Sequence, residues 1–112
     1  MPNYGRLAMS LSINTKAADD HVDVIIEGEV DVSNASQLTD TLEAVLDSAP
    51  TTIDVDMEAV PYIDSTGIGV LVAAAHRAAE GGCGLTISRP QPNVLRVLTL
   101  LGVGSEFNVN EQ

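Results

Sequence analysis

The stretch Asp64-Ser65-Thr66-Gly67-Ile68-Gly69 lies between two segments of different periodicity. Residues 53–57, before it, alternate apolar and acidic side chains, which predicts a short strand. From residue 68 to residue 79 apolar side chains recur every three or four positions, which predicts a helix. The stretch therefore lies where a strand passes into a helix N-terminus, and the unpaired N–H groups there favour negative charge. We expect Ser65 to be exposed and to serve both as the helix cap and as a functional residue.

Strand and helix patterns continue upstream of this stretch. Alternation predicts strands over residues 7–13 and 22–26, joined as an antiparallel hairpin through the polar residues 15–21. The pair Ser33-Asn34 is typical of a helix cap, and Pro50 follows the end of the helix. The apolar face of that helix consists of Ala35, Leu38, Leu42, Val45, Leu46 and Ala49.

Downstream, the helix that begins at about Ser65 is expected to stop at Gly81-Gly82. Residues 85–87 predict a fourth strand, residues 92–101 a third helix ended by Gly102, and residues 107–109 a short edge strand. The element order is β-β-α-β-α-β-α-β. Right-handed crossovers then predict an α/β fold with a mixed, mostly parallel sheet and helices packed on one side. We expect a single domain spanning residues 1–112.

Composition and charge narrow the classes of function. Sixteen acidic residues and five basic ones give a net charge of −11. That field repels nucleic acid backbones and anionic lipid surfaces, so we expect neither nucleic acid nor membrane binding. Cys83 is the only cysteine in the sequence, and no apolar stretch is long enough to cross a bilayer. We expect a cytosolic protein.

Enzyme active sites find little support in the sequence. Ser65 and His76 lie on one predicted helix, about 16 Å apart along its axis, which excludes a hydrogen-bonded catalytic pair. His21 remains as an alternative base, but the strained Gly-x-Ser-x-Gly turn is absent. An aspartic protease would need an Asp-Ser/Thr-Gly triplet in an all-β chain, whereas Asp64 is followed by Ser-Thr-Gly and three helices are predicted. We expect no catalytic residues.

Metal and nucleotide sites are equally unsupported. Two sets of possible metal ligands lack any specific ligand spacing. One set is Asp19, Asp20, His21 and Asp23, and the other is Asp54 and Asp56. Neither Gly-Lys-Ser/Thr nor Gly-x-Gly-x-x-Gly occurs in the chain. We therefore expect no metal and no cofactor.

Three segments resemble one protein family. The stretch Val60-Pro61-Tyr62-Ile63-Asp64-Ser65-Thr66-Gly67-Ile68-Gly69-Val70-Leu71 closely resembles the signature of STAS domains of the anti-sigma factor antagonist type. Gly28-Glu29-Val30-Asp31, followed by Ala35 and Leu38, resembles the end of that family's second strand. Residues 94–103 resemble its last long helix and the turn after it. The resemblance covers about Leu7 to Val109.

The resemblance implies a phosphorylation site and its surroundings. In this family the serine directly after the motif aspartate is phosphorylated, which matches Ser65, and Thr66 is a less favoured acceptor. The family's aspartate at the end of strand two matches Asp31. The implied surroundings of the phosphorylated serine, where a partner binds, are Asp31, Asp64, Thr66, Gly67, Ile68 and Gly69.

The resemblance also implies a bacterial transcription regulator that works by partner switching. The unphosphorylated form would bind an anti-sigma factor that is also a serine kinase, and so free the sigma factor. Phosphorylation of Ser65 would abolish that binding, and a PP2C-type phosphatase would restore it. The alternative is a STAS binding module in a switch or scaffold whose output is not a sigma factor. The sequence names neither the sigma factor nor the stimulus.

Overall fold

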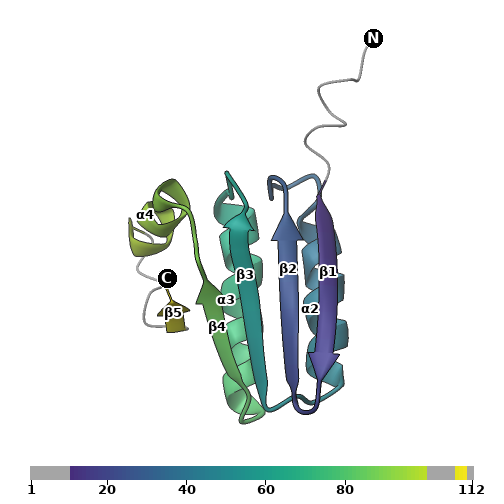
Figure 1. Cartoon of the computed structure of the whole chain (residues 1–112). Helices are drawn as coiled ribbons and strands as arrows, with labels where there is room; N and C mark the ends of the chain where they lie inside the picture. The colour runs from purple at the N-terminus through teal and green to yellow at the C-terminus, as the bar shows by residue number, and fades with distance from the viewer. Residues whose placement is uncertain (1–10, 101–107, 111–112) are drawn as a thin grey trace.

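The computed structural model describes residues 11–100 and 108–110, and there the predicted order of elements is confirmed (Figure 1). The strands and helices, in chain order, are β1 Ser12–Ala18, β2 His21–Glu27, α2 Ala35–Asp47, β3 Thr52–Ala59, α3 Ser65–Glu80, β4 Gly84–Ser88, α4 Pro92–Leu100 and β5 Asn108–Asn110.

The described strands form one mixed sheet in the order β1-β2-β3-β4-β5. β1 and β2 are antiparallel, and every other neighbouring pair is parallel. Sequence neighbours are therefore also neighbours in the sheet, and each parallel pair is joined through a helix. The mostly parallel sheet that the sequence predicts is confirmed.

The core lies between the sheet and the two long helices. Figure 1 shows α2 and α3 side by side behind one face of the sheet. Alternate residues of β2 and β3 point toward those helices and are buried, because strand side chains alternate between the two faces. α4 lies beside the end of β4, and its Val94 and Leu98 join the same core. The buried side chains of the two central strands are Val22, Val24, Ile26, Ile53, Val55 and Met57.

The first strand lies further along the chain than predicted. Residues 15–18, expected in the connection, are part of β1, which pairs with β2 along its whole length. β1 is an edge strand whose side chains are largely exposed, so it needs no continuous apolar alternation. The turn is confined to Asp19 and Asp20, and Asp19 adopts a left-handed conformation with φ 55°, which aspartate tolerates. The predicted strand residues 7–10 lie outside the described part of the chain.

Helix ends differ little from the predictions. α3 has the expected bounds, and the left-handed Gly82, φ 77°, follows its end. α2 ends at Asp47, so Ala49, expected on its apolar face, is exposed and left-handed. Gly102, the predicted stop of the third helix, lies outside the described residues.

The sheet face opposite the helices is polar and carries three paired acidic residues, Asp23, Asp54 and Asp56. His21 Nδ1 lies 2.7 Å from Thr52 Oγ1, and its Nε2 lies 2.7 Å from Asp23 Oδ1. Ser88 donates a hydrogen bond to Asp54. Arg89 pairs with Asp56, and this contact raises the pKa of its guanidinium above the usual value. These carboxylates thus have hydrogen-bond partners within the protein.

Candidate functional site

Two segments that follow β2 and β3 pair beyond the ends of those strands. Val30 and Ile63 form a parallel bridge. The Val30 N–H donates to the Tyr62 carbonyl at 3.0 Å, and the Asp64 N–H donates to the Val30 carbonyl at 3.1 Å. Because the carboxyl ends of parallel strands meet at one edge of a sheet, the pairing brings Asp31 beside Asp64.

Asp64, and not Ser65, caps α3. Its backbone is extended, with φ −95° and ψ −177°, and its Oδ1 accepts a hydrogen bond from the Gly67 N–H at 3.0 Å. This is the geometry of an N-cap side chain bonded to the third helical residue. Ser65 is the first helical residue and is exposed. The prediction that Ser65 is itself the cap is wrong, because Ser65 is already helical and the side chain of the preceding Asp64 accepts the Gly67 N–H.

Replacement of Asp64 by alanine is expected to lower the free energy of unfolding by about 1–2 kcal/mol, because the Gly67 N–H loses its acceptor. Replacement by serine, which retains a capping oxygen, should cost clearly less. Urea unfolding of the wild type and both variants measures the two values. Equal losses in Asp64→Ala and Asp64→Ser would contradict the assignment of Asp64 as the cap.

The loop after β2 is held by its own side chains. Asp31 Oδ1 accepts hydrogen bonds from the Ser33 hydroxyl at 2.5 Å and from the Ser33 N–H at 2.9 Å. Asn34 Oδ1 accepts from the Asp31 N–H, and Asn34 Nδ2 donates to the Glu29 carbonyl, each at 2.9 Å. Asn34 occupies the N-cap position of α2 without a side-chain capping bond. The Ser33-Asn34 pair was predicted to cap the helix, but its side chains order the loop and make no capping bond to α2.

The hydrogen bond from the Ser33 hydroxyl, with a second from its N–H, lowers the pKa of Asp31 below its usual 3.8. We expect Ser33→Ala to raise this pKa toward 3.8, which carboxyl-detected NMR titration measures. A folded-state pKa below the unfolded value stabilises the fold above the unfolded pKa. This contribution should disappear as the pH falls through the lowered pKa. An unchanged Asp31 titration in Ser33→Ala would contradict the assignment.

The remaining predicted site residues divide into buried and exposed positions. Gly67 and Ile68 are buried, so they fix the start of α3 against the core and offer no contact surface. Thr66 and Gly69 are exposed. Both line a groove between α2 and α3.

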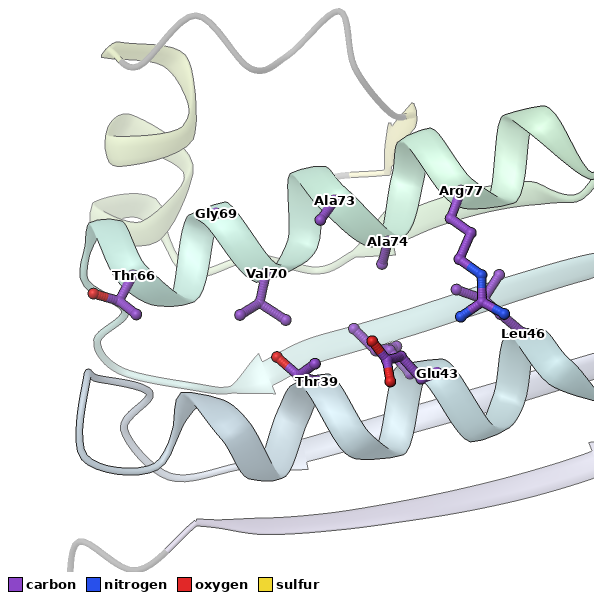
Figure 2. Close-up of a pocket in the computed structure, with 10 residues that line it drawn as sticks. Thr39, Glu43, Leu46, Thr66, Gly69, Val70, Ala73, Ala74 and Arg77 are labelled. Carbon is purple, nitrogen blue, oxygen red and sulfur yellow. The ribbon is translucent and has the colours of Figure 1, made fainter.

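That groove has a volume of about 320 Å³ and is mainly apolar (Figure 2). Figure 2 shows Thr66 at one end and Arg77 toward the other, with Glu43 on the α2 side. Arg77 is already paired with Asp47 at 2.5 Å. The lining residues are Thr39, Leu42, Glu43, Leu46, Thr66, Gly69, Val70, Ala73, Ala74 and Arg77. None of them has the nucleophile–base arrangement of an active site.

Two exposed apolar side chains beside Ser65 were not predicted as site residues. Val32 is 75% exposed and Tyr62 is 47% exposed. Each belongs to one of the two paired segments, so both lie at the same edge of the sheet as Ser65. In the sequence, Val32 is an isolated apolar residue between the polar Asp31 and Ser33. That isolation is the sequence signal that its side chain is exposed.

The histidines do not approach Ser65. His76 is exposed on the same helix, eleven residues further along, as predicted. His21 begins β2, whereas Ser65 lies beyond the opposite end of that strand, so the two residues are more than about 20 Å apart at 3.3 Å per residue. Within the described ranges, no group of three histidine, cysteine or acidic side chains is placed to hold a metal ion. Nor does any helix there have the length and apolarity to span a membrane.

Comparisons with known proteins agree with this arrangement. A family model described as "Mlab, STAS domain" matches residues 13–108. The anti-sigma-B factor antagonist of Listeria monocytogenes serovar 1/2a is 29% identical over 102 residues, which cover 90% of each chain. An anti-sigma factor antagonist from Mycobacterium paratuberculosis superposes with a TM-score of 0.80 at 25% identity, covering 92% of this chain and 87% of that one.

A third neighbour shares the fold at lower identity. The Bacillus cell fate determinant SpoIIAA, solved in its phosphorylated form, has a TM-score of 0.70 at 20% identity and covers 88% of this chain and 90% of its own. The family match spans most of the sequence, and the sheet order, the helices and the motif at the start of α3 are consistent with it. The chain belongs to the STAS domain family.

Proposed function

We propose that this protein is an anti-sigma factor antagonist that works by partner switching. Unphosphorylated, it binds an anti-sigma factor that is also a serine kinase, and the sigma factor is released. Phosphorylated on Ser65, it no longer binds. The observation that carries the proposal is the exposed Ser65 hydroxyl at the first position of α3, beside two paired loops that present Val32 and Tyr62.

The relatives support this assignment. The Listeria protein is named an anti-sigma-B factor antagonist, and the Mycobacterium structure is described as an anti-sigma factor antagonist. The Bacillus neighbour exists in a phosphorylated form. By the same reasoning we infer a regulatory binding protein in the cytosol that has no catalytic residues and no cofactor of its own. ATP would bind to the kinase, and a PP2C-type phosphatase would remove the phosphate from Ser65.

A phosphate on Ser65 is expected to change the stability of the fold little, because two local electrostatic effects oppose each other. Phosphorylation adds roughly −1.5 to −2 charges. The N-terminus of α3 favours that charge by about 0.3–1 kcal/mol. The carboxylates of Asp31 and Asp64 oppose it at the same edge of the sheet. Because these effects are similar in size, the change in partner affinity arises in the complex and not from unfolding.

Phosphorylation by the cognate kinase tests the assignment of the acceptor. Incubation with that kinase and ATP should add one phosphate to the wild type and to Thr66→Ala, and none to Ser65→Ala. Intact-mass spectrometry followed by peptide mapping measures this directly. Both variants change an exposed hydroxyl on the same turn of α3, so they are matched in structure. Modification of Ser65→Ala at the wild-type rate would contradict the proposal.

A second candidate is a STAS binding module whose output is not a sigma factor. The description of the matching family model favours it, since that description names Mlab and no sigma factor antagonist. Affinity capture with the unphosphorylated protein distinguishes the two. Recovery of an anti-sigma factor supports the first function, and recovery of a different assembly with no anti-sigma factor supports the second.

A further inference from the structure

One carboxylate at the site serves two segments that are 32 residues apart in sequence. Asp64 Oδ1 accepts the hydrogen bond from the Gly67 N–H at 3.0 Å, which begins α3. Asp64 Oδ2 accepts a hydrogen bond from the Val32 N–H at 3.2 Å, in the loop after β2. The same side chain thus fixes both the helix that bears Ser65 and the neighbouring loop.

The second of these hydrogen bonds is not needed to cap the helix. An N-cap requires one acceptor oxygen for the third helical N–H, and serine serves as well as aspartate. The hydrogen bond to Asp64 Oδ2 holds the backbone of Val32 in place. The Val32 side chain is 75% exposed. On either side of Val32, the N–H and hydroxyl of Ser33 donate hydrogen bonds to the Asp31 carboxylate. Val32 is therefore an exposed apolar residue in an ordered loop.

An apolar side chain held rigidly in solvent is suited to binding a partner. Ordering a loop before association removes an entropy cost that the complex would otherwise bear. Buried apolar anchors at the centre of an interface also carry much of its affinity. The hydrogen bond joins the Val32 backbone to Asp64, the residue directly before Ser65, so a partner bound over the Ser65 hydroxyl approaches the loop that carries Val32.

We propose that Asp64 is a positioning residue, which holds Val32 in the conformation in which the partner binds it. This rests on the proposed function, because the partner is taken to be the anti-sigma factor. The matching surface on that partner is an apolar socket for Val32, edged by basic groups that face Asp31. The net charge of −11 on this protein suits such a basic edge.

Hydrogen exchange in the free, full-length protein tests the positioning step. Asp64→Ser keeps an oxygen for the Gly67 N–H but has no second acceptor for Val32. The Val32 amide should exchange about tenfold faster in this variant than in the wild type, because it loses its hydrogen bond to Asp64 Oδ2. The amides of α3 should keep their wild-type rates. An unchanged Val32 rate would overturn the proposal.

A double-mutant cycle tests whether Asp64 acts on the partner through Val32. The affinities of the wild type, Val32→Ala, Asp64→Ser and the double variant for the purified cognate anti-sigma factor are measured by calorimetry. Each single change should weaken binding about tenfold, and the double variant should be no weaker than either. A loss of about a hundredfold in the double variant would show that Asp64 acts independently of Val32. Wild-type affinity in Val32→Ala would equally overturn the proposal.

The two experiments separate this inference from the proposed function. If the wild type binds no anti-sigma factor, the proposed function fails, and with it the role assigned to Val32 in binding that partner. The exchange rate of the Val32 amide still decides whether Asp64 positions the loop. If the wild type binds and the cycle is additive, the proposed function stands, but Asp64 does not act on the partner through Val32.

Discussion

Replacement of Gly67 by alanine is expected to lower the free energy of unfolding by about 1–3 kcal/mol, the usual cost of overpacking a core. A Cβ atom at Gly67 would lie 2.7 Å from Ile63 Cγ1 and 2.7 Å from Val30 Cγ1. Both neighbours are buried, and they form the bridge that joins the two site segments. Both side chains are packed in the core, so they must shift to admit the added methyl group, and the strain falls on the two site segments.

Gly69 offers a matched control on the same helix. A Cβ atom there would meet nothing within 4 Å. Gly69→Ala should therefore stabilise the protein by about 0.5–1 kcal/mol, because alanine is the better helix former. Urea unfolding of both variants gives the comparison. The packing account would be contradicted if Gly67→Ala were as stable as Gly69→Ala.

Replacement of Ser65 by aspartate is expected to weaken binding of the anti-sigma factor by about a hundredfold or more. A carboxylate pressed into an interface built for a neutral hydroxyl loses hydration and finds no partner, at a cost of several kcal/mol. Each 1.4 kcal/mol corresponds to about tenfold in affinity. Calorimetric titration with the purified anti-sigma factor measures the effect.

Ser65→Ala is the control for this substitution. It removes the hydroxyl without adding charge, so its affinity should stay within a few-fold of the wild type. Because Ser65 is exposed and does not cap α3, both variants should unfold within about 0.5 kcal/mol of the wild type. Wild-type affinity in Ser65→Asp would argue against charge as the signal.

The parts of the fold that the sequence predicts well are those with a buried, periodic face. α3 has apolar residues at helical spacing, Asp64 at its start and Gly81-Gly82 at its end, so its bounds were predictable. β1 was misplaced because an edge strand is stabilised by its pairing with β2 and not by a buried face. Residues 15–18 therefore carry no apolar alternation that distinguishes them from a loop.

The candidate site was predictable where one local motif contains it. Ser65 and Asp64 lie in the motif itself, and Asp31 follows from the resemblance at the end of β2. The bond between Asp64 and Val32 was not predictable, because it joins residues from separate segments. The sequence alone does not separate Asp64 from Ser65 as the cap, because serine and aspartate have similar capping preferences, and only the geometry distinguishes the two residues.

The affinity of the phosphorylated protein for the anti-sigma factor tests the central claim most directly. The protein is phosphorylated at Ser65 by the kinase, its stoichiometry is verified by mass, and it is titrated beside the unphosphorylated form. The account predicts affinity at least about a hundredfold weaker after phosphorylation, with a melting temperature within a few degrees of the unmodified protein. Equal affinity of the two forms would contradict it.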